Sequence, residues 1–101
     1  MTAPTTPSVQ TLIDTYGKDI AFAAGQEPAS TASVFIGQLT TAAINLDEAG
    51  INNTENLDNA ATNLSDALNS TDRDEVRILL NRVGRYLKAT ADLVGEYRHM
   101  A

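Results

Sequence analysis

The strongest constraint on the fold is a run of residues in the last third of the chain that are spaced alternately four and three positions apart. The run consists of Val76, Leu80, Val83, Leu87, Thr90, Val94 and Tyr97. This is the heptad spacing of a helix that buries one stripe against other helices. Asp72 with Glu75 three positions later predicts the start of the helix, and Arg98 and His99 suit its last turn, where cations are favoured. The pattern therefore predicts a helix over residues 72–99.

Three earlier segments carry apolar residues at the same helical spacing and are predicted to be helices over about 7–24, 29–49 and 53–69. The predicted buried faces are Val9, Leu12, Ile13, Tyr16, Ile20 and Ala23 in the first, Ala32, Phe35, Ile36, Leu39, Ala42, Ala43 and Leu46 in the second, and Leu57, Ala60, Ala61, Leu64, Ala67 and Leu68 in the third. Thr6 followed by Pro7 predicts the start of the first helix, and Gly25 predicts its end. Gly50 followed by Ile51 predicts the end of the second, because glycine takes the left-handed conformation and the next apolar side chain folds back on the helix.

The third predicted helix lies in an asparagine-rich stretch. Asn56, Asn59 and Asn63 fall opposite its leucines and form a solvated face. Asn52 is the predicted cap, with Glu55 three positions on. An interior asparagine costs about 0.5–0.7 kcal/mol relative to alanine. We therefore expect this helix to be the least stable of the four and to form only when its leucines are buried.

Four amphipathic helices joined by short connections predict an all-α protein, an antiparallel four-helix bundle. We expect one domain over residues 7–101, preceded by a disordered lead over residues 1–6. The end of the last helix is left three options at this point: it projects, it pairs with another copy, or it frays. Two long hairpins packed across a dimer are the alternative architecture.

Composition removes several functional classes. The 101-residue chain has no cysteine, which excludes disulfides, thiolate metal sites and cysteine nucleophiles. Glu96 and His99 match half of a di-iron motif, but the chain has one histidine and no second copy of the motif. We expect no catalytic residues, no metal, no cofactor and no enzymatic activity. No apolar run approaches the roughly 20 residues of a membrane span and no signal peptide is evident, so we expect a cytoplasmic protein, with leaderless export or assembly into a virus particle left open.

Charge is unevenly distributed along the chain. The net charge is −6, but residues 1–72 carry one lysine against nine acids, whereas residues 73–101 carry five arginines and Lys88 against four acids. This asymmetry predicts attraction between the two parts, within one chain or between copies. Overall acidity disfavours general binding to nucleic acid.

The candidate partner-binding residues all lie in the last predicted helix: Ile78, Gly84, Ala91, Gly95, Arg77 and Lys88. Gly84, Ala91 and Gly95 form a narrow strip of small residues beside the heptad stripe. An interior glycine costs about 1 kcal/mol relative to alanine, so these positions suit close approach of another backbone. Either a partner or the bundle itself could supply that backbone. Ile78 falls on the polar side of the helix, and Arg77 and Lys88 supply basic groups.

These features indicate a small acidic protein that acts as a protein–protein interaction or self-assembly module, with a homo-oligomer favoured. The alternative is a regulator of nucleic-acid transactions, either through direct contact by the last helix or through acidic mimicry that binds a basic protein.

Overall fold

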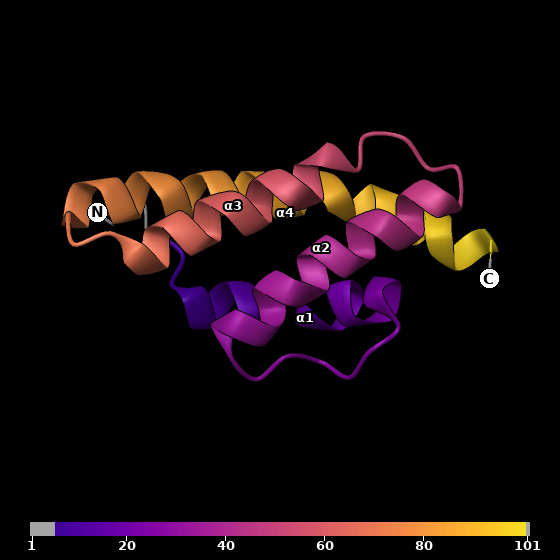
Figure 1. The fold of residues 1–101 in the computed structure, drawn as a ribbon, viewed down its shortest axis with the longest axis horizontal. Helices are drawn as coiled ribbons and strands as arrows, with labels where there is room; N and C mark the ends of the chain where they lie inside the picture. Colours follow the sequence, from indigo (N-terminus) through magenta and orange to yellow (C-terminus); the bar gives the residue numbers. More distant parts are fainter. Residues whose placement is uncertain (1–5, 101) are drawn as a thin grey trace, which may run out of the picture.

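The structure, a computed structural model, describes residues 6–100, and these residues form four helices (Figure 1). They are α1 (Val9–Ala24), α2 (Ala32–Glu48), α3 (Glu55–Asn69) and α4 (Arg73–Met100). The prediction of an all-α four-helix bundle is confirmed, but the bundle is not antiparallel throughout, because α1 and α2 run in the same general direction. The predicted lead over residues 1–6 lies outside the described residues apart from Thr6, which is partly buried.

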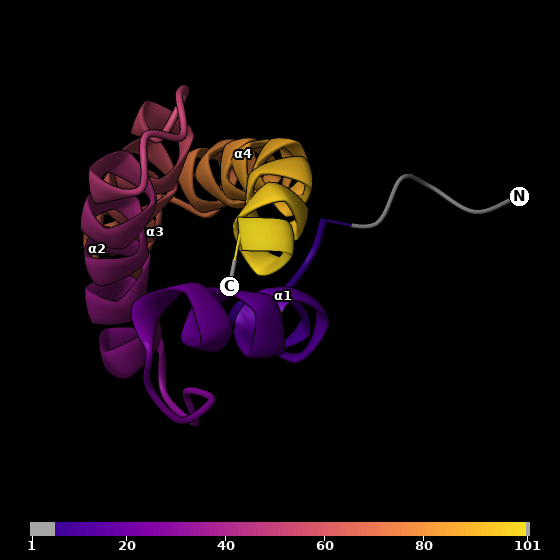
Figure 2. The same cartoon turned by 90° about the vertical axis from the view of Figure 1, so that its right-hand side faces the viewer.

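The four helices pack in a ring around one apolar core. α3 and α4 form an antiparallel hairpin, α2 packs on α3, and α1 closes the ring by packing on α2 and α4 (Figures 1 and 2). The N-terminal part of α4 and the C-terminal end of α3 extend past α1 and α2 along the long axis (Figure 1).

The connection between α1 and α2 sets the direction of α2. Residues 25–31 run back along the bundle, so that α1 and α2 point in the same general direction and cross obliquely (Figures 1 and 2). Two amides of α2 stabilise this arrangement. Gln38 donates through Nε2 to the carbonyl of Glu27, and Asn45 donates through Nδ2 to the carbonyl of Ala23 at 2.9 Å. The second bond joins the C-terminal ends of both helices, which an antiparallel pair with a tight turn could not do.

Three of the predicted helix starts differ from the observed ones by two or three residues. α1 begins after Ser8 rather than Thr6, because the Ser8 Oγ accepts a hydrogen bond from the Thr11 amide at 3.0 Å. α3 begins after Thr54 rather than Asn52, and no side chain caps it, because Asn53 turns the chain with a φ of 67°. Thr31 caps α2 through the Val34 amide, three residues later than the sequence predicted.

The other predicted helix boundaries are confirmed. Gly25 and Gly50 have φ values of 69° and 84°, the left-handed conformation that glycine adopts without strain. After Gly50, the Ile51 amide donates to the Leu46 carbonyl at 3.0 Å and its side chain is buried. Asp72 starts α4, since its Oδ1 accepts from the amides of Asp74 and Glu75.

The core confirms the helical spacing almost throughout. Its fully buried large side chains are Ile20, Phe35, Leu39, Leu46, Leu57, Leu64, Val83, Leu87 and Val94. The heptad position Thr90 is also buried, and its hydroxyl donates to the Leu87 carbonyl at 2.7 Å. Leu68 corrects the prediction: it is 49% exposed, because it lies at the end of α3 that extends past α2.

The C-terminal end of α4 packs on α1. Arg98 forms an ion pair with Asp19 at 2.7 Å, and its guanidinium group lies 4.3 Å from the centre of the Phe22 ring. The Tyr97 ring meets the same Phe22 ring edge-on at 5.9 Å. The described part of the last turn is therefore held by contacts within the chain.

Candidate protein interaction surface

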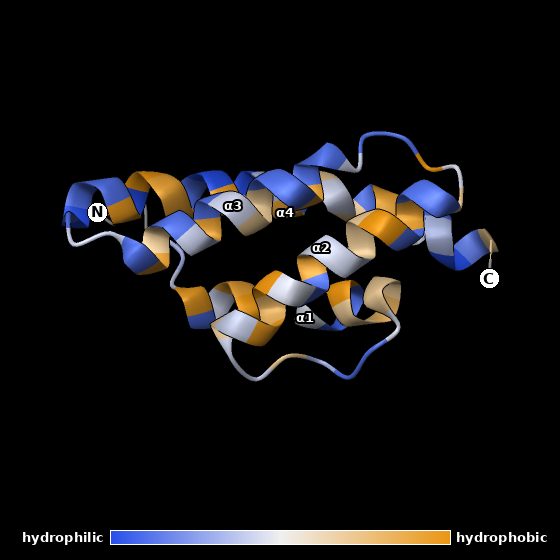
Figure 3. Ribbon diagram, viewed as in Figure 1, coloured by the Kyte–Doolittle hydropathy of each residue, from blue (hydrophilic) through white to orange (hydrophobic). Residues whose placement is uncertain are grey.

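The outward side of α2 differs from the outward sides of the other helices in having no charge over most of its length. Residues 28–46 contain no Asp, Glu, Lys or Arg. In Figure 3, α2 is largely white to orange, whereas α3 and α4 carry many hydrophilic residues. A helix on the surface of a globular protein normally presents charged and polar residues to water. We call residues Ser33, Val34, Gly37, Thr40, Thr41 and Ile44 the α2 outer face.

Two large apolar side chains mark the α2 outer face. Val34 is 48% exposed and Ile44 is 54% exposed. They lie on the same side of the helix, opposite the buried side chains of Phe35, Leu39 and Leu46. Single exposed apolar residues are ordinary on protein surfaces, but two on one uncharged helix face form a patch that water solvates poorly.

The outer-face residues between Val34 and Ile44 are small, and the hydroxyl groups of the two threonines bond to the backbone of α2. The Thr40 hydroxyl donates to the Ile36 carbonyl, and the Thr41 hydroxyl donates to the Gly37 carbonyl at 3.0 Å. With the hydroxyl groups bonded to their own helix, the threonine methyl groups add to the apolar surface. A Cβ atom placed on Gly37 would meet no other atom within 4 Å among the described residues. Packing inside the bundle therefore does not explain this glycine.

The charges at the C-terminal end of α2 oppose the helix dipole. The first turn has no acidic residue and the last turn has no basic residue, while Asp47 and Glu48 lie at the C-terminal end. Backbone carbonyls make that end partly negative, so the two carboxylates are unfavourably placed within α2 itself. α4 has the opposite and favourable arrangement, with Asp74 and Glu75 in its first turn and Arg98 in its last.

Among the candidate residues of α4, Gly84 is used inside the chain. A Cβ atom on Gly84 would lie 3.7 Å from the Pro7 Cγ atom and 3.8 Å from a Leu12 methyl group. The segment that enters α1 thus passes close to α4 at this glycine. The nearest groups are thus side chains of the chain itself, at ordinary contact distance, rather than another backbone.

The remaining candidates all keep part of their surface accessible. Ala91 is exposed, and Gly95 is half-buried with open space around its Cα atom. Ile78 is 50% exposed on the outward side of α4. Lys88 is exposed, and Arg77 is paired with Asp74 at 3.2 Å. Their roles in binding a partner stay predictions.

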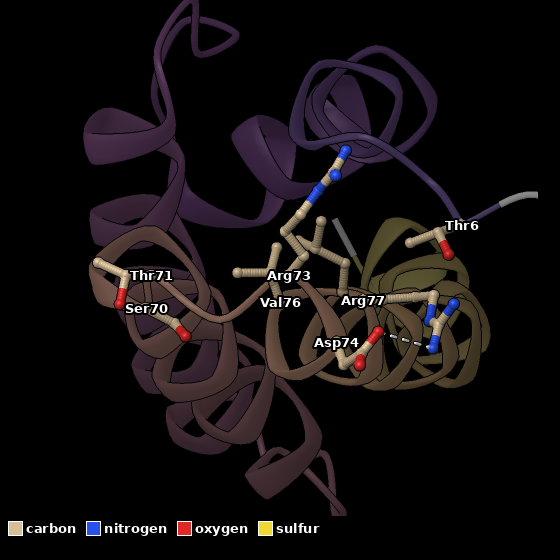
Figure 4. A pocket seen from close by; sticks show the side chains of 8 residues that line it. Thr6, Ser70, Thr71, Arg73, Asp74, Val76 and Arg77 are labelled. Atoms are coloured by element: carbon tan, nitrogen blue, oxygen red, sulfur yellow. Dashed lines mark hydrogen bonds and ion pairs between the residues drawn. The ribbon is translucent and has the colours of Figure 1, made fainter.

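A depression of about 580 Å³ lies where the α3–α4 turn meets the start of the chain (Figure 4). Arg73 and Arg77 line it, with Val76 and Leu80 beneath them. The two guanidinium groups point apart, and Arg77 is held by Asp74 (Figure 4). The amides at the start of α4 already donate to Asp72. The depression therefore does not gather its positive groups around one point, as an anion site requires.

Within residues 6–100, no cluster of three or more His, Asp or Glu side chains is placed to hold a metal ion. No helix in this part of the chain combines the length and apolar character needed to cross a membrane.

Two features of α2 were missed by sequence reasoning. The uncharged stretch over residues 28–46 is visible in the sequence. A search for the buried face of each helix considers the apolar positions that point inward and leaves out the residues on the opposite side. Gln38 lies on the core side of the helix and is buried; its Nε2 is bonded to Glu27, while its Oε1 has no partner among the described residues. The burial of Gln38 is not expected from its residue type, because glutamine is mostly exposed in proteins.

Comparisons with protein-family models, with curated proteins and with solved structures find no match to this chain.

Proposed function

We propose that this protein is a non-enzymatic interaction module that binds another protein through the α2 outer face. The observation that carries the proposal is the pair of exposed residues Val34 and Ile44 on a helix face with no charge. Recognition between helix faces uses such anchors at helical spacing. The small residues between the anchors allow a partner backbone to come close.

The free energy of binding that the α2 outer face can contribute is modest. Full burial of a valine or isoleucine side chain stabilises a protein by about 1.5–3 kcal/mol, and roughly half of each side chain is already buried here. Contact with a partner would therefore contribute about 1 kcal/mol for each anchor. Binding through this face is expected to be reversible and sensitive to single substitutions.

Direct contact of α4 with nucleic acid receives less support. Arg77 and Arg98 are engaged by Asp74 and Asp19, which reduces the charge free to meet phosphate groups. The acidic residues that mimicry would need are spread over all four helices rather than gathered on one face.

Site-specific photo-crosslinking in cells that make the protein tests the proposal. A benzophenone amino acid at Thr40 lies within the α2 outer face, and the same amino acid at the exposed Asp92 of α4 is the matched control. We expect adducts of defined mass from Thr40 and not from Asp92. No adduct from Thr40, or the same adducts from both positions, would overturn the assignment of the surface.

A further inference from the structure

We propose that the partner of the α2 outer face is a second copy of this chain, with the two α2 helices packed antiparallel about a twofold axis at Leu39. This inference rests on the proposed function and specifies its partner. A twofold interface must be complementary to itself, since each residue i that meets j requires that j meet i. The α2 outer face has this property in its spacing and in its charge.

Four of the six residues of the α2 outer face are placed symmetrically about the level of Leu39, whose own side chain is buried on the opposite side of the helix. Val34 and Ile44 lie five positions before and after Leu39, and Gly37 and Thr41 lie two positions before and after it. In an antiparallel pair, Val34 of each chain meets Ile44 of the other at both ends of the contact. Gly37 meets the partner's Thr41 in the middle, where small side chains allow the helices to come close. A parallel pair would instead place like residues together.

The charges at the ends of α2 favour the same arrangement. Antiparallel packing places Asp47 and Glu48 of each copy beside the N-terminal end of the other α2, opposite Thr31 and Ser30. That end is partly positive and has no acidic residue in its first turn. The carboxylates that oppose the dipole of their own helix would thus complement the dipole of the partner helix. The chain as a whole carries a net charge of −6, which opposes approach of a second copy.

The size of the face sets the strength of the dimer. Val34 and Ile44 are about 15 Å apart along the helix at roughly 1.5 Å per residue. A contact of this length between two helices falls short of the roughly 800 Å² that each partner buries in a stable complex. The dimer is therefore expected to be weak and to form only as the protein is concentrated.

Sedimentation equilibrium over a wide concentration range measures this association. The purified chain should pass from monomer to dimer with a single dissociation constant. Ile44→Glu should weaken the dimer by at least about tenfold, because the substitution occurs at both ends of the contact. Ile78→Glu is the matched control, since Ile78 has nearly the same exposure on α4 and should leave the constant unchanged. Loss of the dimer in Ile78→Glu but not in Ile44→Glu would overturn the proposal.

Crosslinking tests the antiparallel direction. The chain has no cysteine, so single cysteines introduced as Val34→Cys and Ile44→Cys react without interference. With a short bifunctional maleimide, a mixture of the two variants should give the mixed dimer in excess over either variant alone. Crosslinks from each variant alone, and none in excess from the mixture, would indicate parallel packing and contradict the symmetry.

The proposal that the partner is a second copy and the proposed function of the α2 outer face can be refuted separately. A chain that remains monomeric at all concentrations, yet gives Thr40 adducts with a different protein in cells, overturns the second copy and leaves the interaction surface in place. A monomeric chain that gives no Thr40 adducts overturns both.

Discussion

Substitution of Gly37 by alanine is predicted to raise the stability of the monomer and to weaken its association into a dimer. Gly37 is an exposed residue in the interior of α2, and a Cβ atom there meets nothing within 4 Å among the described residues. Alanine at such a position removes the conformational freedom of glycine in the unfolded chain. Gly37→Ala should therefore raise the free energy of unfolding by about 1 kcal/mol, the difference in helix propensity. For a domain of this size, that gain corresponds to a rise in Tm of about 4–8 °C.

Gly95→Ala is the matched control for this substitution. Gly95 also lies in a helix interior with open space around it, so Gly95→Ala should raise Tm by a similar amount. Gly50→Ala should lower Tm instead, because Gly50 has a φ of 84°. Only Gly37→Ala should also weaken the dimer, since its added methyl group stands where the partner helix approaches.

Circular dichroism at low protein concentration measures Tm for the monomer, and sedimentation equilibrium measures association for the same samples. A fall in Tm for Gly37→Ala would refute the assignment of Gly37 to open space. A rise in Tm with unchanged association would refute its place at the centre of the dimer.

Three further substitutions test the packing of the bundle. Leu64→Ala should lower the free energy of unfolding by about 2–5 kcal/mol because Leu64 is fully buried, whereas Leu68→Ala should cost less than about 1 kcal/mol; equal losses in urea denaturation would contradict the observed exposure of Leu68. Asp72→Ala should cost about 1 kcal/mol through loss of the cap of α4, and a change near zero in the same assay would show that Asp72 does not cap the helix. A double-mutant cycle between Asp19 and Arg98 should give a coupling of about 0.2–1 kcal/mol, since both side chains are nearly half exposed; a coupling that does not fall as salt is added would rule out an ion pair.

The helices themselves could be predicted from the sequence because burial follows their period. The heptad stripe of α4 is buried as predicted from Leu80 to Val94, including the polar Thr90, since its position rather than its polarity decides its burial. Val76 and Tyr97, at the two ends of the stripe, are half-buried. Leu68 has the correct period and is still exposed. Whether a residue at the end of a helix is covered depends on how far the neighbouring helix extends. The spacing of apolar residues within one helix gives no information about that length.

The direction of α2 could not be predicted from local pattern. Short connections usually join antiparallel helices, but residues 25–31 are long enough to run back along the bundle. Asn45 and Gln38 stabilise this path by donating to the carbonyls of Ala23 and Glu27. Contacts between residues this far apart in sequence leave no periodic signal.

The candidate surface was overlooked for a related reason. The glycines of α4 attract attention because they interrupt a strong helix, and Gly84 proves to contact the chain's own Pro7. Gly37 is an equally exceptional residue in a helix whose outward side lacks charge. The informative signal in the sequence is therefore what residues 28–46 lack rather than a motif that they contain.

The most direct test of the α2 outer face as a self-interface is a dilution series followed by amide chemical shifts in nuclear magnetic resonance. Each amide reports its own surroundings, so the series identifies the residues that change as the dimer forms. We predict shifts that depend on concentration across residues 33–44 and at the start and end of α2, with residues 84–95 of α4 unchanged. Shifts confined to α4, or none at any concentration, would contradict a dimer formed through α2.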